Sequence, residues 1–221
     1  MGYYADMKCT QKQFEEMRRN GTLRLAFIGM SNIGKSHISK HLATKMGFGR
    51  IEIDEAIGKH LSLQSISSVA EWLGYPDSAT YAEREAQYLS YEAEETRRAM
   101  HELNAPSTLD TTGSVIYMPE ELLRSLKENW LIINFSVNEK DVDELFRIFI
   151  AEPKPIIWSG MFRHDAGEQF DTALEKSYRS LLADRNKRYR ELADVTVNRF
   201  AMYRAKTGNA ILDVIGEALT R

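Results

Sequence analysis

Apolar segments and helical repeats alternate along this chain. Five short segments are strand candidates: residues 23–28, 50–53, 107–110, 130–135 and 195–198. Of these, 23–28 and 130–135 have the apolar composition of buried strands. Between them, apolar side chains recur at helical spacing, as at Ile38, Leu42 and Met46. Short strands separated by helices predict a doubly wound parallel sheet, an α/β fold of three layers (α/β/α) with right-handed crossovers.

The same pattern predicts where the helices and irregular segments lie. We expect helices at residues 7–20, 34–46, 54–104 (with turns near Ser62 and at 74–77), 119–128, 141–151 and 168–192, and a last one carrying Ile211, Ile215 and Leu219. Residues 152–167 hold two prolines and two glycines and predict an irregular segment. We therefore expect an N-terminal helical extension at 1–22 and a single domain at 23–221, with a lid at roughly 152–170.

Composition and charge exclude several classes of protein. Of the 221 residues, 43% are hydrophobic and 28% are charged, which is typical of a folded globular protein. A net charge of −3 gives no basic field for nucleic acid or an anionic membrane. Cys9 is the only cysteine, so no internal disulfide can form. We expect a cytoplasmic protein without a targeting segment, a monomer or weak dimer.

One motif carries most of the chemical information. The segment from Gly29 to Ser36 matches G-x-x-x-x-G-K-[ST], the P-loop (Walker A) motif, here called the phosphate loop. It lies between an apolar strand and an amphipathic helix. This arrangement directs backbone N–H groups and a helix N-terminus at phosphate. It predicts ATP and Mg²⁺ as ligands, with Lys35 on the β and γ phosphates and Ser36 on the metal. The predicted ATP contacts are Gly29, Asn32, Ile33, Gly34, Lys35, Ser36 and His37.

Three acids follow predicted strands. Asp110 stands where phosphate-loop proteins place a second Mg²⁺ contact, although an acid at a strand end can also simply cap a turn. Glu52 and Asp54 alternate with isoleucines, so the period of a strand places both carboxylates on one side at its carboxyl end. Asp54 is then a candidate to orient an acceptor hydroxyl, and Glu52 a candidate metal contact. The alternative is that both are solvated acids before a helix.

At several of these motifs the chain resembles the shikimate kinase family of small phosphate-loop kinases. The resemblance runs from residue 23 to about 197, in the segments 25–57, 81–85, 111–115, 185–186 and 192–197. It implies phosphorylation of a hydroxyl on a small, anionic metabolite by ATP, under a closing lid. By position, Asp54, Gly113 and Arg185 match residues that bind the acceptor in the family. Arg147 matches an arginine that lies against the adenine ring. Lys154 occupies the position of the family's catalytic lid arginine.

The departures from the family concern the acceptor. Ala82 replaces the arginine that grips the substrate carboxylate, and Thr111 and Thr112 replace two glycines. A charge-assisted contact contributes about 1.5–3 kcal/mol. Another acceptor, such as a sugar acid, or a nucleotide-binding module that has lost acceptor phosphorylation, therefore remains an alternative. Arg163 is a second candidate lid cation, and Arg84 a candidate replacement for the lost grip.

The remaining features have simpler interpretations. His37 and His41 are four residues apart, but no third ligand accompanies them, so we expect no metal there. The charged run from Glu92 to Arg98 predicts a solvated helix face. Trp158, in the predicted lid, is a candidate to close over a ligand.

Overall fold

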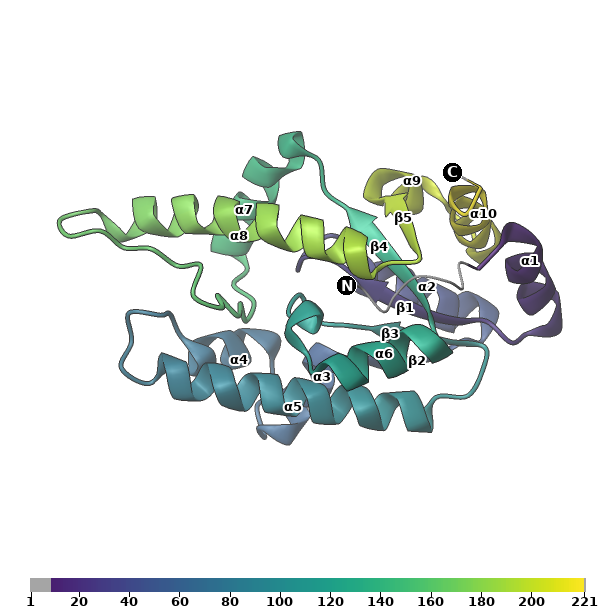
Figure 1. The fold of residues 1–221 in the computed structure, drawn as a ribbon, viewed down its shortest axis with the longest axis horizontal. Coiled ribbons are helices and arrows are strands. Elements are labelled where there is room, and N and C mark those ends of the chain that lie inside the picture. Colours follow the sequence, from purple (N-terminus) through teal and green to yellow (C-terminus); the bar gives the residue numbers. More distant parts are fainter. Residues whose placement is uncertain (1–8, 221) are drawn as a thin grey trace.

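The computed structural model describes residues 9–220. Five parallel strands form one sheet in the order β2-β3-β1-β4-β5 (Figure 1). The strands are β1 (Arg24–Ile28), β2 (Gly49–Glu52), β3 (Ser107–Asp110), β4 (Leu131–Ser136) and β5 (Val195–Asn198). The predicted doubly wound parallel sheet is confirmed.

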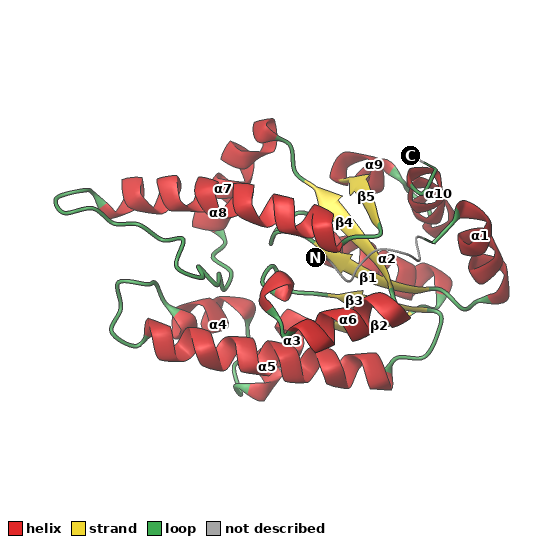
Figure 2. Ribbon diagram, in the orientation of Figure 1, coloured by secondary structure: helices red, strands yellow, loops and turns green. Residues whose placement is uncertain are grey.

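Helices cover both faces of the sheet (Figure 2). Helices α2 and α10 pack on the strands of one face, and α6 and α8 pack on the other. The helices are α1 (Gln11–Asn20), α2 (Lys35–Met46), α3 (Ile53–His60), α4 (Ile66–Leu73), α5 (Tyr81–Glu102), α6 (Glu120–Asn129), α7 (Val142–Ala151), α8 (Phe170–Leu192), α9 (Arg199–Arg204) and α10 (Gly208–Ala218), with short 3-10 turns η1 (Val115–Tyr117) and η2 (Glu139–Asp141). Coverage from both sides explains why β1 is apolar from Leu25 to Ile28 and why all four residues of β3 are buried, its polar side chains included.

The core is centred on β1, whose residues 25–28 are completely buried between β3 and β4. The rings of Phe27 and Phe135 meet edge to face at 5.4 Å between centroids, across neighbouring strands. Packing of this kind fixes the carboxyl end of β1, from which the glycine-rich segment departs.

The N-terminal helix is docked on the rest of the chain. Thr10 and Gln13 form a capping box at the start of α1, and Gly21, at φ 66°, ends it. Phe14 is fully buried, with its ring against the α10 backbone at Gly216. The predicted helix at 7–20 thus begins at Gln11, while its residues 7 and 8 lie outside the described part.

The boundary between β2 and α3 differs from expectation in a way that affects the site, and one short helix was not expected. The strand predicted at 50–53 ends at Glu52, and α3 begins at Ile53. Asp54 and Glu55 lie in the first turn of that helix, where the positive end of the helix dipole favours acids. The prediction that Asp54 lies on the strand was therefore wrong. The residue nevertheless lies just beyond the carboxyl end of β2, where the sequence placed it. Helix α9 was not predicted; the Asn198 side chain caps it.

Helices α5 and α8 extend beyond the sheet (Figure 1). The segment between α7 and α8, predicted as a lid, contains neither helix nor strand. Where this segment ends, the start of α8 meets the α4–α5 loop: the ring centroids of Phe170 and Tyr75 are 5.3 Å apart. Among the helices within residues 9–220, none has the length and apolarity needed to cross a membrane.

Candidate active site

The glycine-rich segment 29–34 joins β1 to α2 and has the backbone of an anion-binding loop. Gly29, Asn32 and Gly34 have φ values of 133°, 64° and 99°. A Cβ atom on Gly29 would lie 2.5 Å from Ile33 Cδ1 and 3.2 Å from the Phe135 carbonyl oxygen, so the position requires glycine. Gly34 is the N-cap of α2, and no side chain caps this end. The first-turn N–H groups are thereby available to an anion.

Lys35 is a buried cation at the centre of this loop. Its side chain is 6% exposed, and Nζ donates hydrogen bonds to the carbonyl oxygens of Gly29 at 2.9 Å and Met30 at 3.0 Å. Burial lowers the pKa of the ammonium group, and the nearby Asp110 and Asp54 carboxylates counteract part of this effect. Neither bonded partner is an anion, so a phosphate group fits this position.

Ser36, Glu52 and Asp110 lie at the loop as candidate metal contacts. Ser36 Oγ donates to Glu52 Oε1 at 2.9 Å, and Glu52 is also paired with Arg50. Asp110 is 2% exposed, accepts a hydrogen bond from Ser39, and has its pKa raised to about 6 by burial. Within the described residues, no cluster of three or more His, Cys, Asp or Glu side chains could hold a metal by itself. The set fits Mg²⁺, which takes one or two carboxylates and completes its shell with phosphate oxygens and water.

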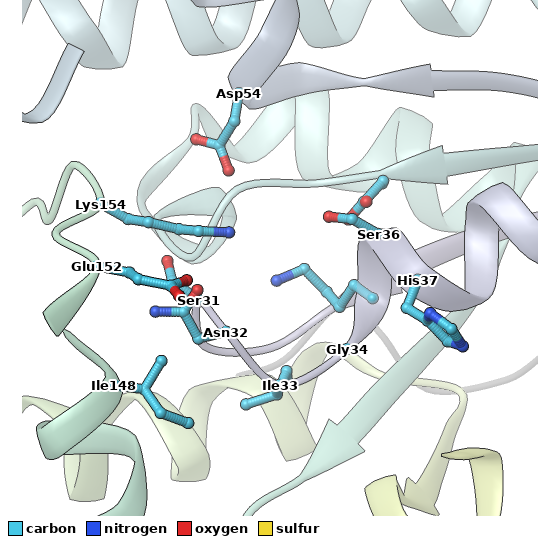
Figure 3. Close-up of a pocket in the computed structure, with 12 residues that line it drawn as sticks. Ser31, Asn32, Ile33, Gly34, Ser36, His37, Asp54, Ile148, Glu152 and Lys154 are labelled. Atoms are coloured by element: carbon cyan, nitrogen blue, oxygen red, sulfur yellow. The ribbon is translucent and has the colours of Figure 1, made fainter. Parts of the chain in front are cut away.

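A cavity of about 230 Å³ lies over the loop. Figure 3 shows the Asp54 carboxylate and the Lys154 amine pointing into this space, the first from α3 and the second from the segment after α7. The lining residues are Ser31, Asn32, Ile33, Gly34, Lys35, Ser36, His37, Asp54, Asp110, Ile148, Glu152 and Lys154. The fold thus brings the phosphate loop, two acids and a second cation to one cavity.

Asp54 is held by a tyrosine from α5. The buried Tyr88 donates its hydroxyl to Asp54 Oδ1 at 2.9 Å. Withdrawal from water raises the pKa of Asp54, while the Tyr88 hydrogen bond and the charges of Lys35 and Lys154 act in the opposite direction. Figure 3 shows the carboxylate facing the cavity, where its second oxygen, Oδ2, can accept a hydrogen bond from a ligand.

Arg185 and Gly113 lie together beside the phosphate loop. Arg185 is 1% exposed, and its guanidinium contacts the Ile157 carbonyl oxygen and the Met30 sulfur, with no carboxylate among these partners. Its Nε has no hydrogen-bond partner within residues 9–220. A Cβ on Gly113 would lie 3.0 Å from Arg185 Nη1 and 3.4 Å from Ser31 Oγ, so glycine permits the close approach.

Glu92 is a site-adjacent residue that the sequence analysis misplaced. The prediction of a solvated face from Glu92 to Arg98 is wrong at Glu92, which is 1% exposed, and at Glu95, which is 6% exposed. The two carboxylate oxygens of Glu92 accept hydrogen bonds from Thr112 and Ser114, on either side of Gly113. The Thr112 side chain therefore turns toward α5. No local signal separates this acid from its exposed neighbours, because its partners lie about 20 residues further along the chain.

Other candidates lie outside the cavity lining. Arg147 is exposed on α7, where Nε donates to the Asp143 carbonyl oxygen. Arg84 donates to the Trp72 carbonyl oxygen and Arg163 is exposed. Trp158 is 1% exposed, packed edge-on against Phe162, and so belongs to the core.

The geometry defines a phosphate-loop protein with an acidic and a cationic group facing the phosphate site. Among solved structures, the chain is similar to the shikimate kinase from Bacteroides thetaiotaomicron, with 16% sequence identity and a TM-score of 0.61 over 90% of this chain and 99% of that chain. It is similar to the shikimate kinase from Acinetobacter baumannii in complex with shikimate, with 19% identity and a TM-score of 0.60 over 92% of this chain and 94% of that chain. It is also similar to the shikimate kinase from Aquifex aeolicus, with 19% identity and a TM-score of 0.55 over 90% of this chain and 96% of that chain. The chain therefore has the shikimate kinase fold. No family model matches the sequence, and no curated protein matches it.

Proposed function

We propose that this protein is an ATP-dependent kinase that transfers the γ-phosphoryl group of Mg²⁺·ATP to a hydroxyl of a small, anionic metabolite. The observation that carries the proposal is the meeting of Lys35, Asp54 and Lys154 at one cavity over a phosphate loop. The fold shared with shikimate kinases supports the reaction class. The single cysteine supports a reducing compartment, and we propose a cytoplasmic enzyme that is a monomer or a weak dimer.

Each part of the site has a role in this proposal. The loop N–H groups and Lys35 hold the β and γ phosphates, and Ser36, Glu52 and Asp110 hold Mg²⁺ directly or through water. When bound, the metal neutralises charge on the phosphates. Lys154 adds a positive charge from the lid side. Catalysis by such a site consists of positioning and electrostatic stabilisation.

Asp54 is the residue proposed to orient the acceptor. Its Oδ1 is held by Tyr88, which fixes the carboxylate in the cavity. A carboxylate so placed can accept the hydrogen bond of an acceptor hydroxyl and direct its oxygen at the γ-phosphate.

Arg185 supports an acceptor with an anionic group. Within residues 9–220 the buried Arg185 guanidinium forms no ion pair with a carboxylate, although the charge of the buried Glu92 acts on it. Burying this charge is costly, and an anionic ligand would offset part of that cost. Since Ala82 cannot supply a second grip, a sugar acid is a candidate beside shikimate. A nucleotide-binding module without acceptor phosphorylation is the second candidate, favoured by the Ile157 carbonyl oxygen that already occupies one Arg185 N–H.

The test is ADP release from Mg²⁺·ATP with shikimate, quinate and gluconate as separate acceptors. We expect one of them to stimulate release in a saturable way. Lys35→Ala and Asp54→Asn should each reduce the stimulated rate at least about 100-fold, because each removes a positioning or charge contact to the reacting groups. Lys45→Ala, at an exposed position on the same helix as Lys35, is the matched control and should retain the rate.

Two results would count against the proposal. Full stimulated activity in Lys35→Ala would exclude the phosphate loop as the site of transfer. ATP binding without stimulation by any hydroxylated acceptor would favour the nucleotide-binding module instead.

A further inference from the structure

A buried acid lies behind the loop that follows β3, without a role in the proposal above. Glu92 is 1% exposed on α5, and its carboxylate accepts hydrogen bonds from the Thr112 and Ser114 hydroxyls. These two residues flank Gly113, whose carbonyl oxygen accepts a further hydrogen bond from Tyr189 of α8. The loop is thus held by two helices, and one of its anchors is a carboxylate.

Glu92 also lies within the electrostatic field of the two charged groups proposed to bind the acceptor. Its charge acts on Arg185, and the Asp54 carboxylate acts on Glu92 in turn. The Arg185 guanidinium passes close to Gly113, since a Cβ there would lie 3.0 Å from Nη1. The neighbours of Gly113 bond the acid while Gly113 itself borders the cation. A single short loop therefore joins Glu92 to the group that would meet an anionic acceptor.

The ionisable groups that face Glu92 come from three helices, while the loop after β3 contributes hydroxyls. They are Asp54 on α3, Tyr88 on α5, and Arg185 and Tyr189 on α8. Burial raises the pKa of both tyrosines, so they are neutral at neutral pH, and the guanidinium keeps its charge throughout. Burial also raises the pKa of Glu92 to about 7. The charge of this acid therefore changes near neutral pH.

We propose that Glu92 is a positioning residue that sets the affinity for an anionic acceptor, acting through Arg185 and the loop at Gly113. The inference rests on the proposed function and deepens it, since it concerns the acceptor of that same site. An ionised Glu92 opposes the positive potential of Arg185, whereas a protonated Glu92 does not. The acceptor anion therefore binds more tightly to the protonated form. By linkage, its binding draws a proton from the buffer onto Glu92.

The test measures KM and kcat of ADP release between pH 5.5 and pH 8.5, with shikimate, quinate and gluconate as the acceptor probes. For the acid that stimulates release, the wild-type KM should exceed that of Glu92→Gln by about 3- to 10-fold at pH 8.5, because one unit of pKa shift on binding corresponds to a factor of ten. The two KM values should agree at pH 5.5, where Glu92 carries its proton. The kcat values should follow the same pH profile, because Asp54 and Asp110 are present in both proteins.

A second variant should move the transition instead of abolishing it. Ser114→Ala removes a hydroxyl whose hydrogen bond lowers the pKa of Glu92. The rise of KM should then have its midpoint at a higher pH than in the wild type. Glu94→Gln, at an exposed position on the same helix, is the matched control and should follow the wild type at every pH.

Titration calorimetry measures the proton without relying on turnover. Each of the three acids is titrated into the protein with Mg²⁺·ADP at pH 7.5, in buffers of different ionisation enthalpy. Proton uptake should be larger in the wild type than in Glu92→Gln.

Equal uptake in both proteins would overturn the inference. So would a KM ratio that is the same at every pH, which would mean that Glu92 only holds the loop. Binding with proton uptake but without phosphoryl transfer would overturn the proposed function while supporting this inference. Wild-type protein that binds none of the acids would overturn both.

Discussion

At the scale of the residue, Glu92 is an acid kept inside the core. It is 1% exposed and burial raises its pKa to about 7, from an ordinary value near 4.5. Between these two pH values the folded chain holds a proton that the unfolded chain has released. The free energy of unfolding therefore falls as the pH rises through this window, and the cost is complete above pH 7. Groups that destabilise the fold in this way are frequent near functional sites.

Replacement of Glu92 by glutamine should remove this pH dependence. The amide has nearly the same shape and can bond Thr112 and Ser114 without carrying a charge. The difference of 7 − 4.5 = 2.5 pH units corresponds to about 3 kcal/mol. Relative to wild type, Glu92→Gln should therefore gain about 2–3 kcal/mol in urea unfolding on going from pH 5 to pH 8. Glu94→Gln, at an exposed position on the same helix, should gain nothing, and equal effects of both variants would contradict the assignment.

At the scale of the element, α5 links three parts of the site through one face. Tyr81, Glu85, Tyr88 and Glu92 are spaced by four, three and four residues, which aligns them along the helix. Tyr81 bonds the Ile156 carbonyl oxygen and the Trp158 N–H, and Glu85 bonds the Ser159 N–H. Tyr88 and Glu92 hold Asp54 and the loop after β3. One helix thus positions three parts of the site: the segment 156–159, which we predict to be part of a lid, Asp54, which we propose orients the acceptor, and the loop at Gly113.

Tyr81→Phe should loosen the segment at 156–159. The change removes the hydroxyl that bonds residues 156 and 158, and a net hydrogen bond contributes about 0.5–1.5 kcal/mol. Hydrogen–deuterium exchange of the amides at 156–159 should accelerate about 2- to 10-fold. Tyr91→Phe is the control, because Tyr91 lies on the same helix as Tyr81 but its ring contacts His60 of α3 instead of the segment at 156–159. Unchanged exchange at 156–159 would show that Tyr81 does not hold this segment in place.

Hydrophobic periodicity predicted the sheet, and the spacing of one motif predicted the phosphate loop, because both features depend on local sequence. The run of apolar residues in β1 and the G-x-x-x-x-G-K-S spacing are sufficient for these two elements. Contacts between segments that are far apart in the sequence leave no such local pattern of residues. Glu92 could not be distinguished from Glu94, because burial depends on Thr112 and Ser114.

At the scale of the whole molecule, stability and chemistry occupy different regions. The carboxyl ends of β1, β2 and β3 deliver the phosphate loop, Glu52 and Asp110 to one edge of the sheet, where such folds bind ligands. Helix α1 instead packs on α10 through Phe14, and Arg18 pairs with Asp213 at 2.7 Å. No residue of α1 is among those that line the cavity.

Phe14→Ala should therefore affect folding and spare ligand binding. Removing a completely buried phenylalanine costs about 3–5 kcal/mol in the free energy of unfolding. The dissociation constant for Mg²⁺·ATP should stay within twofold at a temperature where the variant remains folded. Glu16→Ala, on the exposed side of α1, is the control and should leave both quantities unchanged. A large loss of ATP affinity in Phe14→Ala would show that α1 contributes to the site.

The central claim is that the γ-phosphoryl group passes to a small-molecule hydroxyl. The most direct measurement follows the label of γ-³²P-ATP after incubation with the protein, Mg²⁺ and each hydroxylated acid in turn. The account predicts label in a phosphate monoester of one acceptor, formed by the wild type and by Lys45→Ala but not by Asp54→Asn. Label that remains in ATP, or appears only as inorganic phosphate, with every acceptor would contradict it.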